Sequence, residues 1–263
     1  MEILWQILVQ FIFRLSFGLA LGMAVTPSRL VTSGFFRVHL WVLMGVNTLA
    51  VLALYSNQVA FETRIVSWPM TFGCAIGLVV LSYVGAVVWL YEGTRSGSFM
   101  LFVVALVALL AAVSATPGLS EMSLFRRSLV CFDSITSGLL IGVMLAAMFL
   151  GHWYLNTPTM QLSPLNRLIT ILFAAILLRT VTCGVGLGIV ISVEAVPSFN
   201  WIFLVFRWLS GFAGAFSMAW LAWLTLKIPN TQSATGILYA GVTFVFIGEL
   251  VSLLLSVDQL YPL

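Results

Sequence analysis

The chain has 263 residues, of which 62% are hydrophobic and 7% are charged, whereas about a quarter of the residues in an ordinary soluble domain are charged. Together with a mean hydropathy of +1.14, this composition excludes a soluble globular protein and predicts an all-α integral membrane protein. A transmembrane β-barrel is excluded as well, because the apolar runs do not alternate with polar residues.

Proline, glycine, asparagine and charged residues divide the chain into about eight apolar segments, most of them as long as the roughly 20 residues that span a bilayer. In chain order, the predicted spans are 4–26, 36–55, 68–91, 98–115, 127–155, 165–193, 199–227 and 235–256. The connectors between them are short. We therefore predict a bundle of about eight transmembrane helices in a single polytopic domain, 1–263.

Short patterns recur at an offset of four spans. Residues 17–23 read FGLALGM and residues 137–143 read SGLLIGV. A looser likeness links residues 82–89 with residues 217–223. These matches predict a weak 4+4 repeat of two halves with the same orientation. The alternative is chance, because membrane helices share a similar composition.

An even number of spans places both termini on one side of the membrane. The opposite side carries the basic residues Arg29, Arg37, Arg95, Arg167 and Lys227, and the side of the termini carries Arg64, Arg126 and Arg127. Because basic residues are more frequent in cytoplasmic connectors, this bias predicts non-cytoplasmic termini in a cell inner membrane.

Four glycine pairs have the GxxxG spacing, which brings two positions without side chains to one helix face. They are Gly18/Gly22, Gly73/Gly77, Gly138/Gly142 and Gly184/Gly188. We expect them to allow helices to pack closely. For the last pair, the additional Gly186 leaves an alternative, in which the helix unwinds around a substrate.

Away from their ends, the predicted spans contain five charged residues, each of which costs roughly 2.5–3.5 kcal/mol inside the membrane on insertion scales. They are Arg14, Asp133, Arg179, Arg207 and Glu249. Because pairing lowers this cost, we expect an intramembrane charge cluster in the bundle interior, with Arg207 within ion-pair reach of Glu249 or Asp133. Two interpretations stay open: ion pairs that fix the helix register, or a site for an anion, a proton or a small solute.

The two histidines, His39 and His152, are expected about 5 Å inside the same face of the membrane, because one begins the second predicted span and the other ends the fifth. Two imidazoles at one depth on different helices suit the axial ligands of a haem b. The alternative is two interfacial histidines that hydrogen-bond to water or to carbonyl groups. No metal site is expected, because the three cysteines lack metal-ligand spacing.

The sequence contains no motif of the soluble enzymes, such as a P-loop, GxSxG or HExxH. The first functional hypothesis is a membrane subunit of a redox or respiratory assembly, with a haem or quinone site at His39 and His152. The second is a small-solute or ion transporter that uses the charge cluster, and the third is a membrane scaffold without chemistry. Expected partners are the lipid bilayer and other membrane subunits. The small net charge of +3 argues against nucleic acid.

Overall fold

The computed structural model describes residues 2–65, 67–119, 122–157, 159–193, 200–228, 230–258 and 261–263. Within these ranges, eight helices are long and apolar enough to cross a membrane, and the β pairing is an isolated bridge between Ile65 and Pro117. The prediction of an all-α membrane protein with about eight spans is therefore confirmed. The chain divides into two compact units, Met1–Met122 and Ser123–Leu263, which are described separately.

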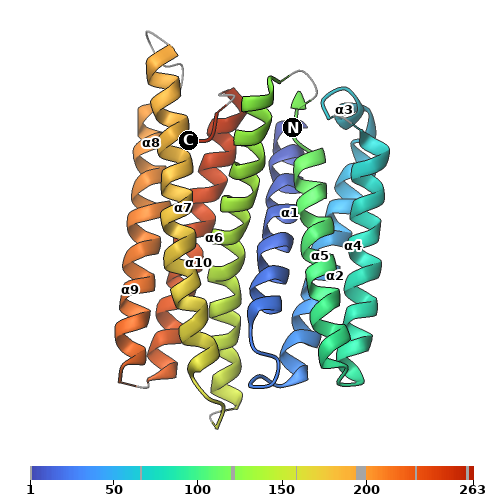
Figure 1. Ribbon diagram of the computed structural model, residues 1–263. Coiled ribbons are helices and arrows are strands. Elements are labelled where there is room, and N and C mark those ends of the chain that lie inside the picture. The colour runs from blue at the N-terminus through green and yellow to red at the C-terminus, as the bar shows by residue number, and fades with distance from the viewer. Residues whose placement is uncertain are drawn as a thin grey trace. The chain divides into compact units, whose positions relative to one another are not determined.

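The first unit contains four spans and one short helix (Figure 1). The spans are α1 (Glu2–Val25), α2 (Ser33–Ser56), α4 (Trp68–Leu90) and α5 (Thr94–Ser114), and the short helix α3 (Gln58–Glu62) lies in a connector. Both α1 and α4 pack against α2 and α5, which closes a ring of four helices. The serine at position 67 caps α4, because its side chain accepts a hydrogen bond from the Met70 N–H.

Polar side chains tie α1 to its neighbours in the first unit. Asn47 Nδ2 on α2 donates to Ser16 Oγ over 3.0 Å, and Gln10 Nε2 donates to the carbonyl oxygen of Ala112 on α5 over 2.9 Å. Polar groups in hydrocarbon have no water partner, so such bonds remove the cost of burying them. These two hydrogen bonds explain how α1 can have polar residues on its buried face.

The second unit contains the other four spans. They are α6 (Leu124–Asn156), α7 (Ser163–Val193), α10 (Thr231–Asp258) and a span in three parts, α8 (Trp201–Trp208), η2 (Leu209–Gly214) and α9 (Ala215–Leu226). The first span, α6, packs against α7 and α10, and the three-part span packs against α10 and, through α9, against α7. Each unit thus has four spans with the same cyclic order of neighbours. This order agrees with the expected 4+4 pattern, while the repeat itself and the single domain stay predictions.

The three-part span differs from the uninterrupted helix expected over 199–227. Residues 209–214 form a π-helical turn, in which the backbone bonds run from residue i to i+5. This turn packs tightly against α10: a Cβ added at Gly248 would lie 2.3 Å from the Cα of Gly211. The sequence located the span correctly, but it did not indicate the irregular turn, which lies where this span contacts α10.

Two of the four glycine pairs with GxxxG spacing do not mark the close contacts that they were expected to mark. A Cβ added at Gly73, Gly77, Gly184 or Gly188 would meet no described neighbour within 4 Å. The prediction of close packing is wrong for these two pairs, because their helix faces do not meet another helix there. The α7 helix also continues across residues 184–188, so the alternative of unwinding at these glycines is wrong too.

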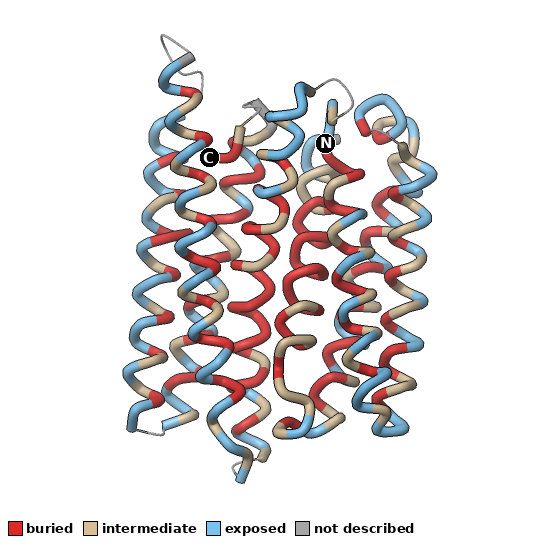
Figure 2. Tube along the Cα trace, viewed as in Figure 1, coloured by how far each residue is buried: buried red, intermediate tan, exposed pale blue. Residues whose placement is uncertain are grey.

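Burial varies strongly from span to span (Figure 2). Every residue from 140 to 148 of α6 is buried. By contrast, α7 exposes Leu177 and Leu178 at 65% and 51%, and α10 exposes Leu250 at 41%. Exposed aliphatic side chains on a membrane-spanning helix contact the lipid, because the hydrocarbon chains surround the protein at that depth.

The fold predicts that the two ends of α4 lie on opposite sides of the membrane. At about 1.5 Å per residue, its 23 residues extend over about 34 Å. Single cysteines at Thr63 and Ser96, in a variant whose native cysteines are replaced by alanine, should react with an impermeant maleimide from opposite sides. Labelling of both positions from the same side would contradict the arrangement of the first unit.

Candidate functional site

Four of the five charges expected inside spans lie together in the second unit. Asp133 is on α6, Arg179 is on α7, Arg207 is in the last turn of α8 and Glu249 is on α10. The exposed fraction of each is 6% or less. Because the four residues come from the four spans of the unit, their contacts connect all of these spans.

The Glu249 carboxylate bridges the two arginines. Its Oε1 accepts hydrogen bonds from Arg179 Nε over 3.1 Å and from Arg207 Nη2 over 3.0 Å. Its Oε2 accepts from Arg179 Nη2 over 2.9 Å and from Ser137 Oγ over 2.6 Å. The four acceptor positions of a carboxylate are thereby used. The expected ion pair between Arg207 and Glu249 is present.

Arg179 donates from all three of its nitrogens to acceptors within the protein. Nη1 pairs with the carboxylate of Asp133, and Nη2 donates to Ser252 Oγ over 3.1 Å as well as to Glu249. A buried guanidinium with every nitrogen bonded has no capacity for a ligand and is strongly destabilising when its partners are removed. Arg179 therefore holds α6, α7 and α10 together.

Arg207 differs from Arg179 because one of its nitrogens has no acceptor. Nη2 donates to Glu249 and lies 3.5 Å from Cys183 Sγ, and Nε donates to the main-chain oxygen of Leu263 over 3.3 Å. In the described part of the chain, Nη1 has no hydrogen-bond partner, although the side chain is fully buried. An unsatisfied buried N–H costs about 1–3 kcal/mol, so an additional acceptor at Arg207 would be stabilising.

The π-helical turn forms the surroundings of Arg207. The ring of Phe212 lies 4.2 Å from the guanidinium carbon in a cation–π contact. Gly211 and Gly248 provide the space for Nη1, since an added Cβ would lie 2.0 Å and 3.3 Å from it, respectively. π-Helical turns are frequent at functional sites, and this one follows the residue whose bonding is incomplete.

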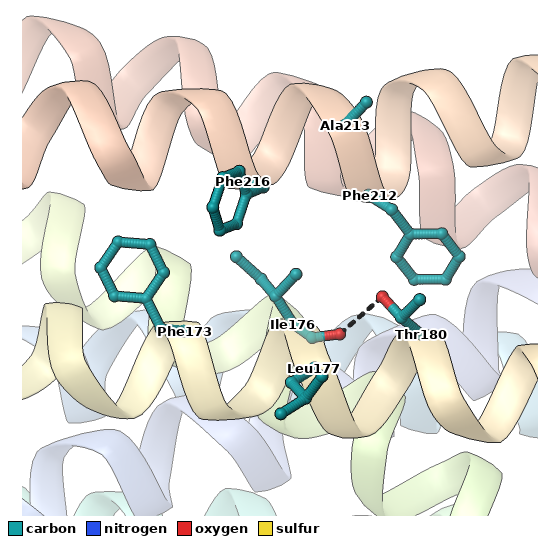
Figure 3. A pocket seen from close by; sticks show the side chains of 7 residues that line it. All are labelled: Phe173, Ile176, Leu177, Thr180, Phe212, Ala213 and Phe216. Carbon is teal, nitrogen blue, oxygen red and sulfur yellow. Dashed lines mark hydrogen bonds between the residues drawn. The ribbon is translucent and has the colours of Figure 1, made fainter.

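An apolar groove of about 480 Å³ lies beside this network (Figure 3). It is lined by Phe173, Ile176, Leu177 and Thr180 of α7, Phe212 and Ala213 of η2, and Phe216 of α9. The Thr180 hydroxyl donates to the Ile176 carbonyl oxygen over 2.8 Å, so the groove suits an apolar chain and not an anion. Phe212 both lines the groove and contacts Arg207.

Arg14, the fifth expected member of the cluster, belongs to the first unit. It lies on α1 with an exposed fraction of 5%, and its Nε donates to Gln10 Oε1 over 3.3 Å. The other four charges belong to the second unit, so a joint role of Arg14 with them stays a prediction.

The two histidines lie in different units and in different surroundings. His39 on α2 is buried, with Nδ1 2.6 Å from the Phe35 carbonyl oxygen. His152 near the end of α6 is exposed, with Nδ1 3.3 Å from the Tyr239 hydroxyl. The geometry of each unit gives no distance between the two imidazoles, so a shared haem or quinone site stays a prediction. No group of three or more His, Cys, Asp or Glu side chains suitable for a metal occurs among the described residues.

Sequence reasoning missed three groups that complete the network: Ser137, Ser252 and the main-chain oxygen of Leu263. Ser137 follows Asp133 by four residues, which places it on the same face of α6, so a signal for it was present. Ser252 follows Glu249 by three residues, which places both side chains on the same face of α10. No sequence pattern indicates that the oxygen of residue 263 contacts Arg207.

No protein-family model, curated protein or solved structure matches the chain. The fold and the site define a multi-pass membrane protein with eight candidate spans and a buried ion-pair network in its second unit.

The contact between η2 and α10 predicts a strong effect of Gly248→Ala. The new Cβ must separate the two elements and weaken the Arg207–Glu249 pair, and such overpacking typically costs about 1–3 kcal/mol. We expect a lower melting temperature for the detergent-purified variant. The matched control is Gly236→Ala on the same helix, where an added Cβ meets nothing within 4 Å and helix propensity favours alanine by about 1 kcal/mol. Equal melting temperatures for the two variants would refute this contact.

Proposed function

We propose that the protein is a carrier for a small anionic solute and that Arg207 is the cation that binds it. The observation that carries this proposal is the incomplete bonding of a fully buried guanidinium, whose Nη1 has no acceptor in the described part of the second unit. The oxygen of an anion supplies such an acceptor in a charge-assisted hydrogen bond. Ionisable residues inside spans commonly mark the path of a solute or an ion.

The interruption of the seventh span supports the same function. The α-helical hydrogen-bonding pattern ends at Trp208 and resumes at Ala215, directly after the residue proposed to bind the solute. Transporters often place their substrate sites where a membrane helix is broken. The π-helical turn also provides a point at which α8 and α9 can move differently, as a carrier requires.

The main alternative interpretation of the network is that it fixes the register of the helices. The two arginines distinguish the interpretations, because Arg179 has complete bonding and Arg207 does not. A purely structural pair gives no reason for an unused nitrogen at Arg207. We therefore assign stability mainly to Arg179 and solute binding mainly to Arg207.

This assignment predicts different phenotypes for Arg179→Gln and Arg207→Gln. Arg179→Gln removes the ion pair with Asp133 and half of the Glu249 contacts. Breaking a buried pair typically costs about 3–5 kcal/mol, so the melting temperature of this variant should fall strongly. Arg207→Gln should keep most of the thermal stability and reduce uptake of the transported anion into liposomes at least about tenfold, equivalent to about 1.4 kcal/mol of binding free energy.

The uptake assay uses purified protein in liposomes with radiolabelled acetate, lactate, pyruvate, 4-methylpentanoate and phosphate, and protein-free liposomes as the control. Arg207→Lys keeps the charge but loses the planar donor arrangement, so it should retain partial uptake. Uptake by Arg207→Gln at the wild-type rate, or no uptake of any of these anions above the control, would overturn the proposal.

We further infer that the protein lies in a cell inner membrane with both termini non-cytoplasmic. This inference rests on the excess of basic residues, among them Arg29, Arg95 and Lys227, at the side opposite to the termini. The bilayer is then the immediate partner of the exposed aliphatic faces. Other membrane subunits remain partners expected only under the redox hypothesis.

The redox hypothesis rests on His39 and His152, and a spectrum tests it directly. Under the carrier proposal, we expect no haem b band in the reduced-minus-oxidised spectrum of the purified protein. A band that disappears in both His39→Ala and His152→Ala, but persists in the control Asn57→Ala, would favour a membrane redox subunit instead. The same spectrum also separates a haem site from a carrier that merely contains two interfacial histidines.

A further inference from the structure

We propose that residues 261–263 occupy the solute site of the second unit, and that the solute is a small carboxylate with a branched aliphatic chain. This inference rests on the proposed carrier function and names its substrate class. The segment Tyr261-Pro262-Leu263 presents an oxygen and an aliphatic side chain to two adjoining parts of the site, in the way that such a solute would.

The polar part of the site binds the main-chain oxygen of Leu263. This oxygen accepts hydrogen bonds from Arg207 Nε over 3.3 Å and from Ser252 Oγ over 2.7 Å. The same Ser252 hydroxyl accepts from Arg179 Nη2 over 3.1 Å. The acceptor oxygen therefore sits directly on the charge network, but it comes from a segment outside the spans.

Residues 261–263 satisfy only part of the hydrogen-bonding capacity of Arg207. Among the described residues, Arg207 Nη1 has no acceptor while Leu263 is in place. A solute carboxylate that replaces the segment forms charge-assisted hydrogen bonds to the guanidinium. A carboxylate is thus expected to compete effectively with the segment.

The apolar part of the site holds the Leu263 side chain. This side chain is fully buried and packs in one cluster with Val190 of α7, Leu204 of α8 and Leu255 of α10. An apolar pocket that encloses a leucine side chain favours a chain of the same size and branching, because each additional or missing methylene changes packing. The main-chain oxygen and the branched side chain of Leu263 together have the shape of a molecule such as 4-methylpentanoate.

A glycine of α7 allows the segment to approach. A Cβ added at Gly186 would lie 1.9 Å from the carbonyl oxygen of Pro262, whereas a Cβ at Gly184 or Gly188 would meet nothing within 4 Å. The middle glycine of this run therefore has a specific role in seating residues 261–263. Since Gly186 contacts the segment and not Arg207, its substitution should expel the segment and leave the charge network in place.

A tethered segment that fills the site lowers the apparent affinity for the solute. The apparent dissociation constant equals the intrinsic one divided by the fraction of molecules with an open site. If the segment occupies the site in about nine molecules of ten, its removal raises the affinity about tenfold. The size of this change measures how strongly the segment competes.

The test measures equilibrium binding of radiolabelled 4-methylpentanoate to the detergent-purified full chain and to three variants. Gly186→Ala and truncation before Tyr261 should each bind the probe at least about tenfold more tightly than the wild type. The matched control Gly184→Ala should bind like the wild type. Arg207→Gln combined with the truncation should abolish binding, and acetate, which lacks the branched chain, should bind more weakly than 4-methylpentanoate.

Addition of the tripeptide Tyr-Pro-Leu in trans provides a second measurement. It should compete with 4-methylpentanoate for the truncated variant and not for its Arg207→Gln form. The inference would be overturned if Gly186→Ala and the truncated variant both bound 4-methylpentanoate with the affinity of the wild type. If the truncated variant unfolds, Gly186→Ala decides alone, and binding no tighter than that of the wild type would again overturn the inference. If another anion is then taken up in an Arg207-dependent manner, the carrier function stands and only the assignment of the solute fails.

Discussion

A charged side chain inside a membrane has no water to solvate it, so it must find its partners in the protein. In the second unit this requirement is met by the bridging carboxylate of Glu249, which accepts hydrogen bonds from both Arg179 and Arg207. Because the paired residues come from different spans, satisfying the charges also fixes how these spans pack. The π-helical turn and the contact between Gly211 and Gly248 bring the helices close enough for the pairing.

We propose that two arginines of the same network divide stability and ligand binding between them. Arg179 is bonded through all three nitrogens. Within the part of the chain that the structure describes, Arg207 has one nitrogen without an acceptor and donates from another to a main-chain oxygen. Both side chains are fully buried, so burial does not distinguish them. What distinguishes them is the count of acceptors within reach, and this difference is the physical basis of the proposed carrier site.

The glycines show how a sequence pattern and a structural role can diverge. The spaced pair Gly184/Gly188 has no close neighbour, whereas Gly186 between them admits the oxygen of Pro262. Gly211 and Gly248 bring two helices close together without any shared motif. A glycine is required where a particular backbone or side chain approaches, and that approach depends on which faces of two helices meet.

The sequence by itself determined the class of protein, the location of the eight spans and the presence of costly charges inside them. Hydropathy and span length are local properties, since they depend only on the bilayer thickness and on the residues of each segment. The tertiary structure decided that Arg207 meets Glu249 and Leu263, that residues 209–214 form a π turn, and that Ser252 joins the network. These features depend on the rotation of each helix about its axis and on contacts between residues distant in the chain, which no local pattern encodes.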